Sequence, residues 1–144
     1  MATDVATISS ILGGSTCEVG SLLDIAHRVE TGLPLSALDR VVQCVAPGEA
    51  RFVGTIVPNA TLSRRRSSPK GALSVEESNK VARLAKVWAM ALRLWDDEAD
   101  AREFLRRPHP MLEGRAPRDV AVASGPGADA VINVMGRGAY GGGV

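Results

Sequence analysis

The segment from Ser74 to Trp95 constrains the fold most, because it combines a helix start signal with a long amphipathic pattern. Ser74 and Glu77 have the S-x-x-E spacing of a capping box, in which both side chains bond backbone N–H groups at a helix start. Six apolar residues then fall within one helical stripe of about 100°: Val81, Leu84, Ala85, Trp88, Leu92 and Trp95. The sequence therefore predicts a long helix here.

Three further apolar residues of this helix lie off that stripe, namely Val87, Met90 and Leu94. One core-facing stripe does not account for them. The helix is therefore either central in its domain or part of a subunit interface. We expect these three residues to support a homodimer.

Composition favours an all-α fold. Aromatic residues make up only 3% of the 144 residues, so the core must consist mainly of Leu, Val, Ile and Ala, which suits helix packing. No stretch approaches the roughly 20 apolar residues of a membrane span, and the N-terminus lacks the basic start of a secretory signal. A cytoplasmic protein without membrane contact is expected. Cys17 and Cys44 show no metal-ligand spacing.

Helical periodicity and proline positions divide the chain into three parts. Residues 1–20 lack sustained periodicity and are expected to be a mobile leader with at most one short helix. Residues 21–72 contain four helical patterns. The second ends before Pro47, the third is expected to have Pro47 in its first turn and to run through about Val57, and the fourth can be capped by Asn59 or Thr61. Residues 73–144 contain the long helix, a helix capped by Asp96 or Asp97, a helix opened by Pro117, and a final helix before a flexible, Gly-rich tail.

Basic residues concentrate in the middle of the chain. The segment from Arg51 to Arg93 has nine basic and two acidic residues, and therefore a net charge of +7. The two short helices before residue 67 form a candidate helix-turn-helix, whose second helix could lie in the major groove of DNA. A solvated basic surface is the alternative. The expected DNA contacts are Thr61, Ser63, Arg64, Arg65, Arg66 and Lys70.

The last nine residues include five glycines. They could form a flexible probe that enters a narrow cleft of a partner, with Arg137, Tyr140 and the carboxylate of Val144 as contacts. A disordered end is the alternative. Arg115, beside Gly114, could bind a carboxylate of a partner or brace the surrounding helices.

No arrangement of residues indicates an enzyme. His27 and His109 have no neighbouring acid or nucleophile in a catalytic pattern. The glycines around Pro126 do not form a phosphate-binding loop, and the acidic run from Asp96 to Asp100 fits a helix start better than a calcium site. No catalytic residue, cofactor or metal site is expected.

Several short motifs occur in an order that resembles the MbcA/ParS/Xre antitoxins. The toxin-binding part of that family has a Leu-Ser-x-Glu-Glu-Ser opening, an Ala-Arg-x-x-Leu stretch and a Leu-x-Gly-Arg-x-Pro loop, as found here at residues 73–78, 101–105 and 112–117. Pro58, Thr61, Arg64 and Arg65 match the Pro-x-x-Thr-x-x-Arg-Arg segment of its Xre-like part. Residues 136–141 match its Gly-Arg-x-x-x-Gly ending.

The resemblance implies an antitoxin of a RES-domain toxin that consumes NAD or transfers ADP-ribose from it. It implies that the C-terminus blocks the entrance to the toxin's active site and that the Xre-like part binds operator DNA for autorepression. The inhibitor itself would need no cofactor. A freestanding helix-turn-helix repressor and a purely structural dimerisation module are the competing interpretations.

Overall fold

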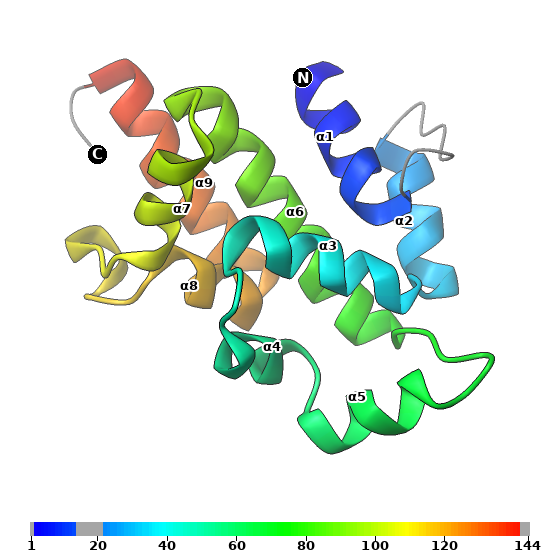
Figure 1. The fold of residues 1–144 in the computed structure, drawn as a ribbon. Coiled ribbons are helices and arrows are strands. Elements are labelled where there is room, and N and C mark those ends of the chain that lie inside the picture. Colours follow the sequence, from blue (N-terminus) through cyan, green and yellow to red (C-terminus); the bar gives the residue numbers. More distant parts are fainter. Residues whose placement is uncertain (1, 14–21, 142–144) are drawn as a thin grey trace.

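Most residues of the chain lie in helices (Figure 1). The computed structural model describes residues 2–13 and 22–141. Within these ranges there is no β-strand, only two isolated bridges, so the predicted all-α fold is confirmed. The helices are α1 (Ala2–Gly13), α2 (Leu22–Thr31), α3 (Leu35–Val45), α4 (Ala50–Ile56), α5 (Asn59–Arg66), α6 (Val75–Trp95), α7 (Glu98–Arg106), the 3₁₀ turn η1 (Pro110–Leu112), α8 (Pro117–Ala123) and α9 (Gly125–Gly141).

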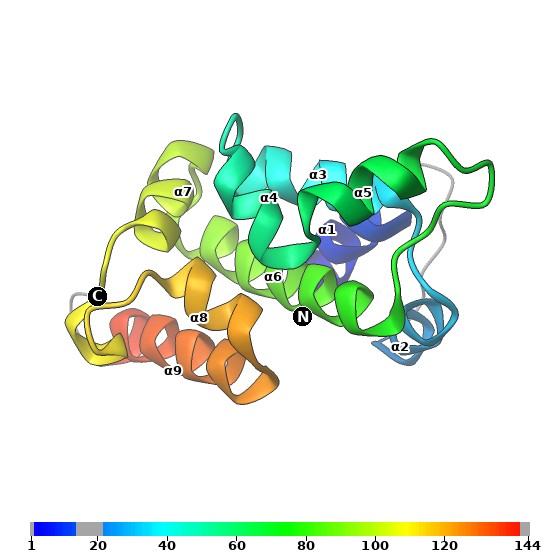
Figure 2. The same ribbon diagram turned by 90° about the horizontal axis from the view of Figure 1, so that it is seen from below.

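The long helix α6 is central, and helices from both halves of the chain pack on it (Figures 1 and 2). Four residues of its apolar stripe, Val81, Leu84, Ala85 and Trp88, are buried together with Val87 in one hydrophobic core that also receives residues from α1, α3, α8 and α9, while Leu92 and Trp95 are partly buried against it. The expectation that Val87 belongs to a dimer surface is therefore wrong, because its exposed fraction is 0% within a single chain. Met90 and Leu94 are partly buried against the same core.

The predicted capping box starts α6. The Ser74 hydroxyl accepts from the Glu77 amide at 3.1 Å, and the Glu77 carboxylate accepts from the Ser74 amide at 2.9 Å. One turn on, the fully buried Ser78 hydroxyl accepts from the amide of Leu33 at 2.9 Å. This bond fixes the linker between α2 and α3 to the start of α6, which positions the N-terminal helices.

The weak periodicity of the N-terminal segment predicts a mobile leader with at most one short helix. The structure has one helix there, and this helix packs on the core. Residues 2–13 form α1, and Ile8, Ile11 and Leu12 are buried in the common core. Arg40 of α3 donates to the last carbonyls of α1, those of Ile11 at 2.6 Å and Leu12 at 3.3 Å. Residues 14–20 of the predicted leader lie outside the described residues.

The predicted helices after α1 are confirmed, with changes at their ends. α4 begins at Ala50 instead of near Pro47, and α5 follows Pro58 without a side-chain cap from Asn59 or Thr61. Asp97 caps α7, its carboxylate accepting from the amide of Ala99 at 2.7 Å. In the described residues, no helix has the length and apolar character needed to cross a membrane.

Candidate functional site

The helices α4 and α5 form a tightly joined pair. Only two residues separate them, and the first, Val57, is fully buried. Phe52, Ile56 and Leu62 turn inward from the two helices, while Ser63 and Arg64 of α5 are exposed. The pair therefore presents one polar face of α5 to solvent, as a helix-turn-helix requires.

Two of the three arginines expected to contact DNA are bound within the protein. Arg66 forms a bidentate ion pair with Asp39 of α3, with N···O distances of 2.7 and 3.2 Å. Arg65 pairs with Glu77 of the α6 capping box. Burial opposes ionisation of Glu77, yet the hydrogen bonds from Ser74 and Arg65 lower its pKa overall. These two arginines hold α5 against α3 and α6.

The remaining predicted DNA residues differ in exposure. Thr61 is half-buried, whereas Ser63, Arg64 and Lys70 are exposed. We call these last three residues the α5 surface, although Lys70 lies in the turn that follows the helix. Arg64 is the arginine of the triplet whose side chain has no ion-pair partner among the described residues. The guanidinium of Arg64 can therefore contact a phosphate group without the loss of an internal ion pair.

The C-terminal segment is more ordered than the predicted flexible tail. Helix α9 continues through Gly141, so the expectation of a flexible segment from Gly136 is wrong for residues 136–141. Val134 and Met135 are buried, and Arg137 is exposed one residue beyond Gly136. Val144 and the side chain of Tyr140 lie outside the described part of the chain. The predicted contact Arg137 is therefore displayed by the end of a helix.

Arg115 lies in the loop between η1 and α8. Its carbonyl accepts from the His109 amide at 3.1 Å, and its amide donates to the carbonyl of Leu112 at 3.1 Å. The preceding Gly114 has a φ of +76°, a conformation that favours glycine. The backbone of Arg115 thus braces the loop, while its side chain is exposed. Bracing of the loop and contact with a partner, the two predicted roles of Arg115, therefore use different parts of the residue.

Several arginines have structural roles that the sequence pattern did not reveal. Arg83 donates to the last carbonyls of α8, those of Ala121 at 3.0 Å and Val122 at 2.7 Å. Arg102 donates to the Cys44 carbonyl at the end of α3, at 2.9 Å. Like Arg40 on α1, each places a cation at a helix C-terminus, where the macrodipole is negative. Arg83 belongs to the basic block, so part of that block serves the fold.

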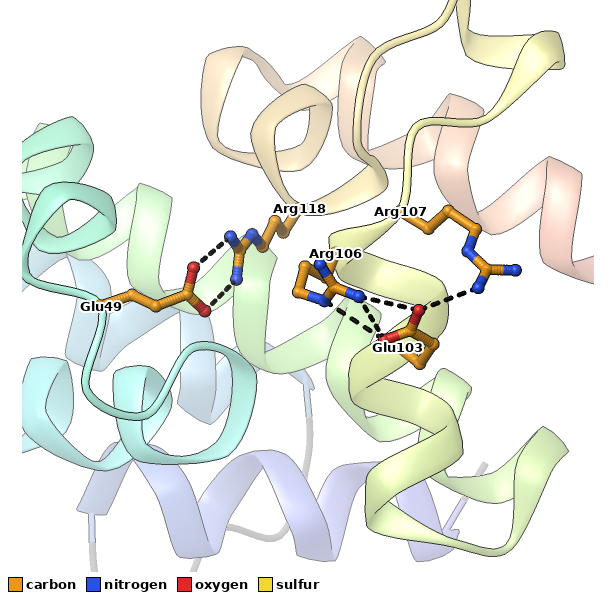
Figure 3. A network of polar contacts seen from close by, with 5 residues as sticks. All are labelled: Glu49, Glu103, Arg106, Arg107 and Arg118. Atoms are coloured by element: carbon orange, nitrogen blue, oxygen red, sulfur yellow. Dashed lines mark hydrogen bonds and ion pairs between the residues drawn. The ribbon is translucent and has the colours of Figure 1, made fainter.

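Two carboxylates and three arginines meet where α4, α7 and α8 approach one another (Figure 3). Arg118 of α8 donates two hydrogen bonds of 2.7 Å to Glu49, the residue before α4. These hydrogen bonds lower the pKa of Glu49. Glu103 pairs with Arg106 at 2.7 Å and Arg107 at 3.1 Å. The pair of Glu49 and Arg118 connects α4 to α8.

The described residues hold no group of three or more His, Cys, Asp or Glu side chains that could bind a metal. Cys44 is half-buried, and burial, reinforced by the charge of Glu98, raises the pKa of its thiol. A raised pKa disfavours the reactive thiolate. Cys17 lies outside the described residues.

Two family models match the chain. Residues 24–86 match the antitoxin Xre-like helix-turn-helix domain, and residues 90–141 match the antitoxin Xre/MbcA/ParS C-terminal toxin-binding domain. No curated protein matches the sequence significantly. The α4–α5 pair lies in the first match, α7 to α9 lie in the second, and the two meet inside α6. With both domains present in this order, the chain belongs to the Xre/MbcA/ParS family of antitoxins.

Proposed function

We propose that this antitoxin neutralises a RES-domain toxin by covering the entrance to the toxin's active site with its C-terminal end. The observation that carries the proposal is the toxin-binding match over residues 90–141, which ends with α9. The RES-domain identity of the toxin, and its use of NAD, come from the sequence resemblance. Arg137, Tyr140 and Val144 are the proposed contacts, with Arg115 as a further one.

The helical end of α9 changes how such a block would work. A flexible probe loses conformational entropy when it enters a cleft, whereas a helix that is already formed loses less. Arg137 would therefore be presented in a fixed direction, and only the residues after α9 would have to adapt. This geometry supports a plug whose base is rigid.

Truncation after Gly136 tests the proposal directly. The last buried residue described in α9 is Met135, so removal of residues 137–144 takes away no described core side chain. We expect the truncated protein to keep its helical circular dichroism signal. It should fail to protect cells that express the toxin and fail to inhibit NAD consumption in vitro. Full protection by the truncated protein would exclude the C-terminal block.

A second proposed activity is operator binding for autorepression. It is supported by the helix-turn-helix match over residues 24–86 and by the exposed Ser63, Arg64 and Lys70 of the α5 surface. Replacement of Arg64 by Ala should weaken operator binding. If Arg64 contacts one phosphate, the slope of log K against log salt should decrease by about 0.9.

The two activities can be separated by crossed substitutions. Arg64→Ala should lower operator affinity and leave toxin inhibition intact, while Arg137→Ala should do the reverse. Both arginines are exposed, so each variant controls for the loss of one surface charge in the other. If the wild type does not inhibit the toxin and Arg64→Ala still lowers operator affinity, a freestanding repressor describes the protein better.

A homodimer remains part of the proposal, but with a smaller predicted surface. Met90 and Leu94 are partly buried and remain candidates for the dimer surface, whereas Val87 is fully buried and is no longer part of it. Sedimentation of the wild type and of a Met90→Lys, Leu94→Lys variant would test it. We expect the wild type to sediment as a dimer and the variant as a monomer with unchanged helical content.

A further inference from the structure

A shallow pocket of about 230 Å³ opens where the end of α6, α7 and the segment before η1 meet. The residues that line it, from Trp95 to His109, all belong to the match with the toxin-binding domain. The pocket is smaller than the roughly 300–1,000 Å³ of typical small-molecule sites. Its size suits one side chain of a partner.

Aromatic rings line the pocket. Trp95 and Phe104 are stacked, with ring centroids 4.6 Å apart and an angle of 27° between the planes. His109 meets Phe104 edge-on, with centroids 5.9 Å apart. The other described Trp and Phe residues, Trp88 and Phe52, are buried in the core. In this chain, which is poor in aromatic residues, the partly exposed Trp and Phe rings of the described residues thus lie together at one place.

Charge is divided along α7 beside these rings. At its C-terminal end, Arg107 lines the pocket but is paired with Glu103 at 3.1 Å. At its N-terminal end, Asp100 lines the pocket, is exposed, and has no ion pair within the described chain. Asp96 and Glu98 are exposed nearby in sequence. A cation on the ring stack would therefore find an unpaired carboxylate.

We infer that this pocket receives an arginine side chain of the toxin, with the guanidinium against the Trp95–Phe104 stack and its charge beside Asp100. The toxin as partner rests on the proposed function. A guanidinium is planar, stacks on aromatic faces and is more weakly hydrated than an ammonium group, so arginine suits this site better than lysine.

The position of the pocket agrees with this partner. Both views place α7 and the C-terminal end of α9 at the same end of the molecule (Figures 1 and 2). A toxin that contacts Arg137 is therefore on the side of the molecule from which α7 can be reached. The pocket would then anchor the complex beside the block without itself touching the reacting groups.

The chemistry of the pocket can be tested without the toxin. The ¹⁵N-labelled full chain is titrated with acetyl-Gly-Arg-Gly-amide, with the isosteric citrulline peptide and with the glutamate peptide, and the indole N–H of Trp95 is followed by NMR. The indole of buried Trp88 is an internal control. We expect saturable shifts with the arginine peptide and at least about fivefold weaker binding of citrulline. Absence of a shift, or equal binding of citrulline or glutamate, would overturn the inference.

Matched variants then separate this inference from the proposed function. Asp100→Asn should remove the preference for arginine over citrulline and weaken toxin binding about fivefold, whereas Asp119→Asn, an exposed control on α8, should change neither. If the wild type binds the toxin and Asp100→Asn binds it equally well, the pocket inference fails alone. If the wild type does not bind the toxin, the proposed function fails, and the peptide titration still decides the pocket chemistry.

Discussion

Arg118 holds Glu49 by two hydrogen bonds of 2.7 Å across 69 positions of sequence. The guanidinium also lies over the ring of Phe52, 4.9 Å from the centroid. Side-chain exposure is unequal, 11% for Arg118 and 39% for Glu49. Removal of the Glu49 carboxylate and removal of the Arg118 guanidinium should therefore destabilise the protein by different amounts.

Glu49→Ala should destabilise the protein more than Arg118→Leu. The first change leaves a mostly buried cation without its carboxylate, while the second leaves a carboxylate that water can reach. We expect a loss of about 2 kcal/mol for Glu49→Ala and about 1 kcal/mol for Arg118→Leu in urea unfolding at neutral pH. The opposite order would mean that packing of Arg118 on Phe52 outweighs the ion pair.

The same pair predicts a pH dependence. The hydrogen bonds from Arg118 lower the pKa of Glu49 below its ordinary value of 4.5. A lowered folded-state pKa stabilises the protein above the unfolded value, and this stability is lost as pH falls through the folded pKa. Between about pH 5 and pH 3, the wild type should therefore lose more unfolding free energy than Glu49→Gln. Parallel pH curves would show that Arg118 does not act on the Glu49 charge.

Arg83 should matter for stability although it belongs to the basic block. Arg83→Met removes both hydrogen bonds to the end of α8 and should cost about 1–2 kcal/mol. The control is Lys86→Met, which replaces an exposed cation one turn along the same helix and should change stability by under about 0.5 kcal/mol. Thermal unfolding of both variants measures the difference.

Two glycines within α9, Gly127 and Gly136, should respond to Ala in opposite directions. A Cβ at Gly127 would lie 2.2 Å from the Val120 carbonyl oxygen, whereas a Cβ at Gly136 would meet nothing within 4 Å. Gly127→Ala should thus lower the melting temperature. Gly136→Ala should raise stability by about 0.5–1 kcal/mol, because Ala loses less backbone entropy in a helix. A loss of stability in Gly136→Ala would argue that α9 does not extend past this position in solution.

Local signals in the sequence predicted most helices correctly. Ser74 and Glu77 act within one turn, and Pro47 and Pro117 act on their immediate neighbours, so these boundaries could be found from spacing alone. The bounds and the burial of helix α1 were not predicted, because its pattern is weak and Ile8, Ile11 and Leu12 are fixed by packing on distant parts of the chain.

The candidate site was harder to predict than the fold. An arginine looks the same in sequence whether it faces DNA, as proposed for Arg64, or pairs internally, as Arg66 does with Asp39. The partners of Arg65, Arg83 and Arg118 lie between 12 and 69 positions away. Spacing rules reach only a few residues and could not identify them.

The two matched domains meet inside α6, between residues 86 and 90, where Val87, Trp88 and Ala89 are buried. A protease cut at this point would expose the centre of the core and remove the support of helices on both sides. The two halves therefore cannot be exchanged as independent modules between relatives. Whatever each half binds, a single unfolding event should end both interactions together, so the lifetime of the folded chain would set the duration of the proposed repression and of the proposed protection alike.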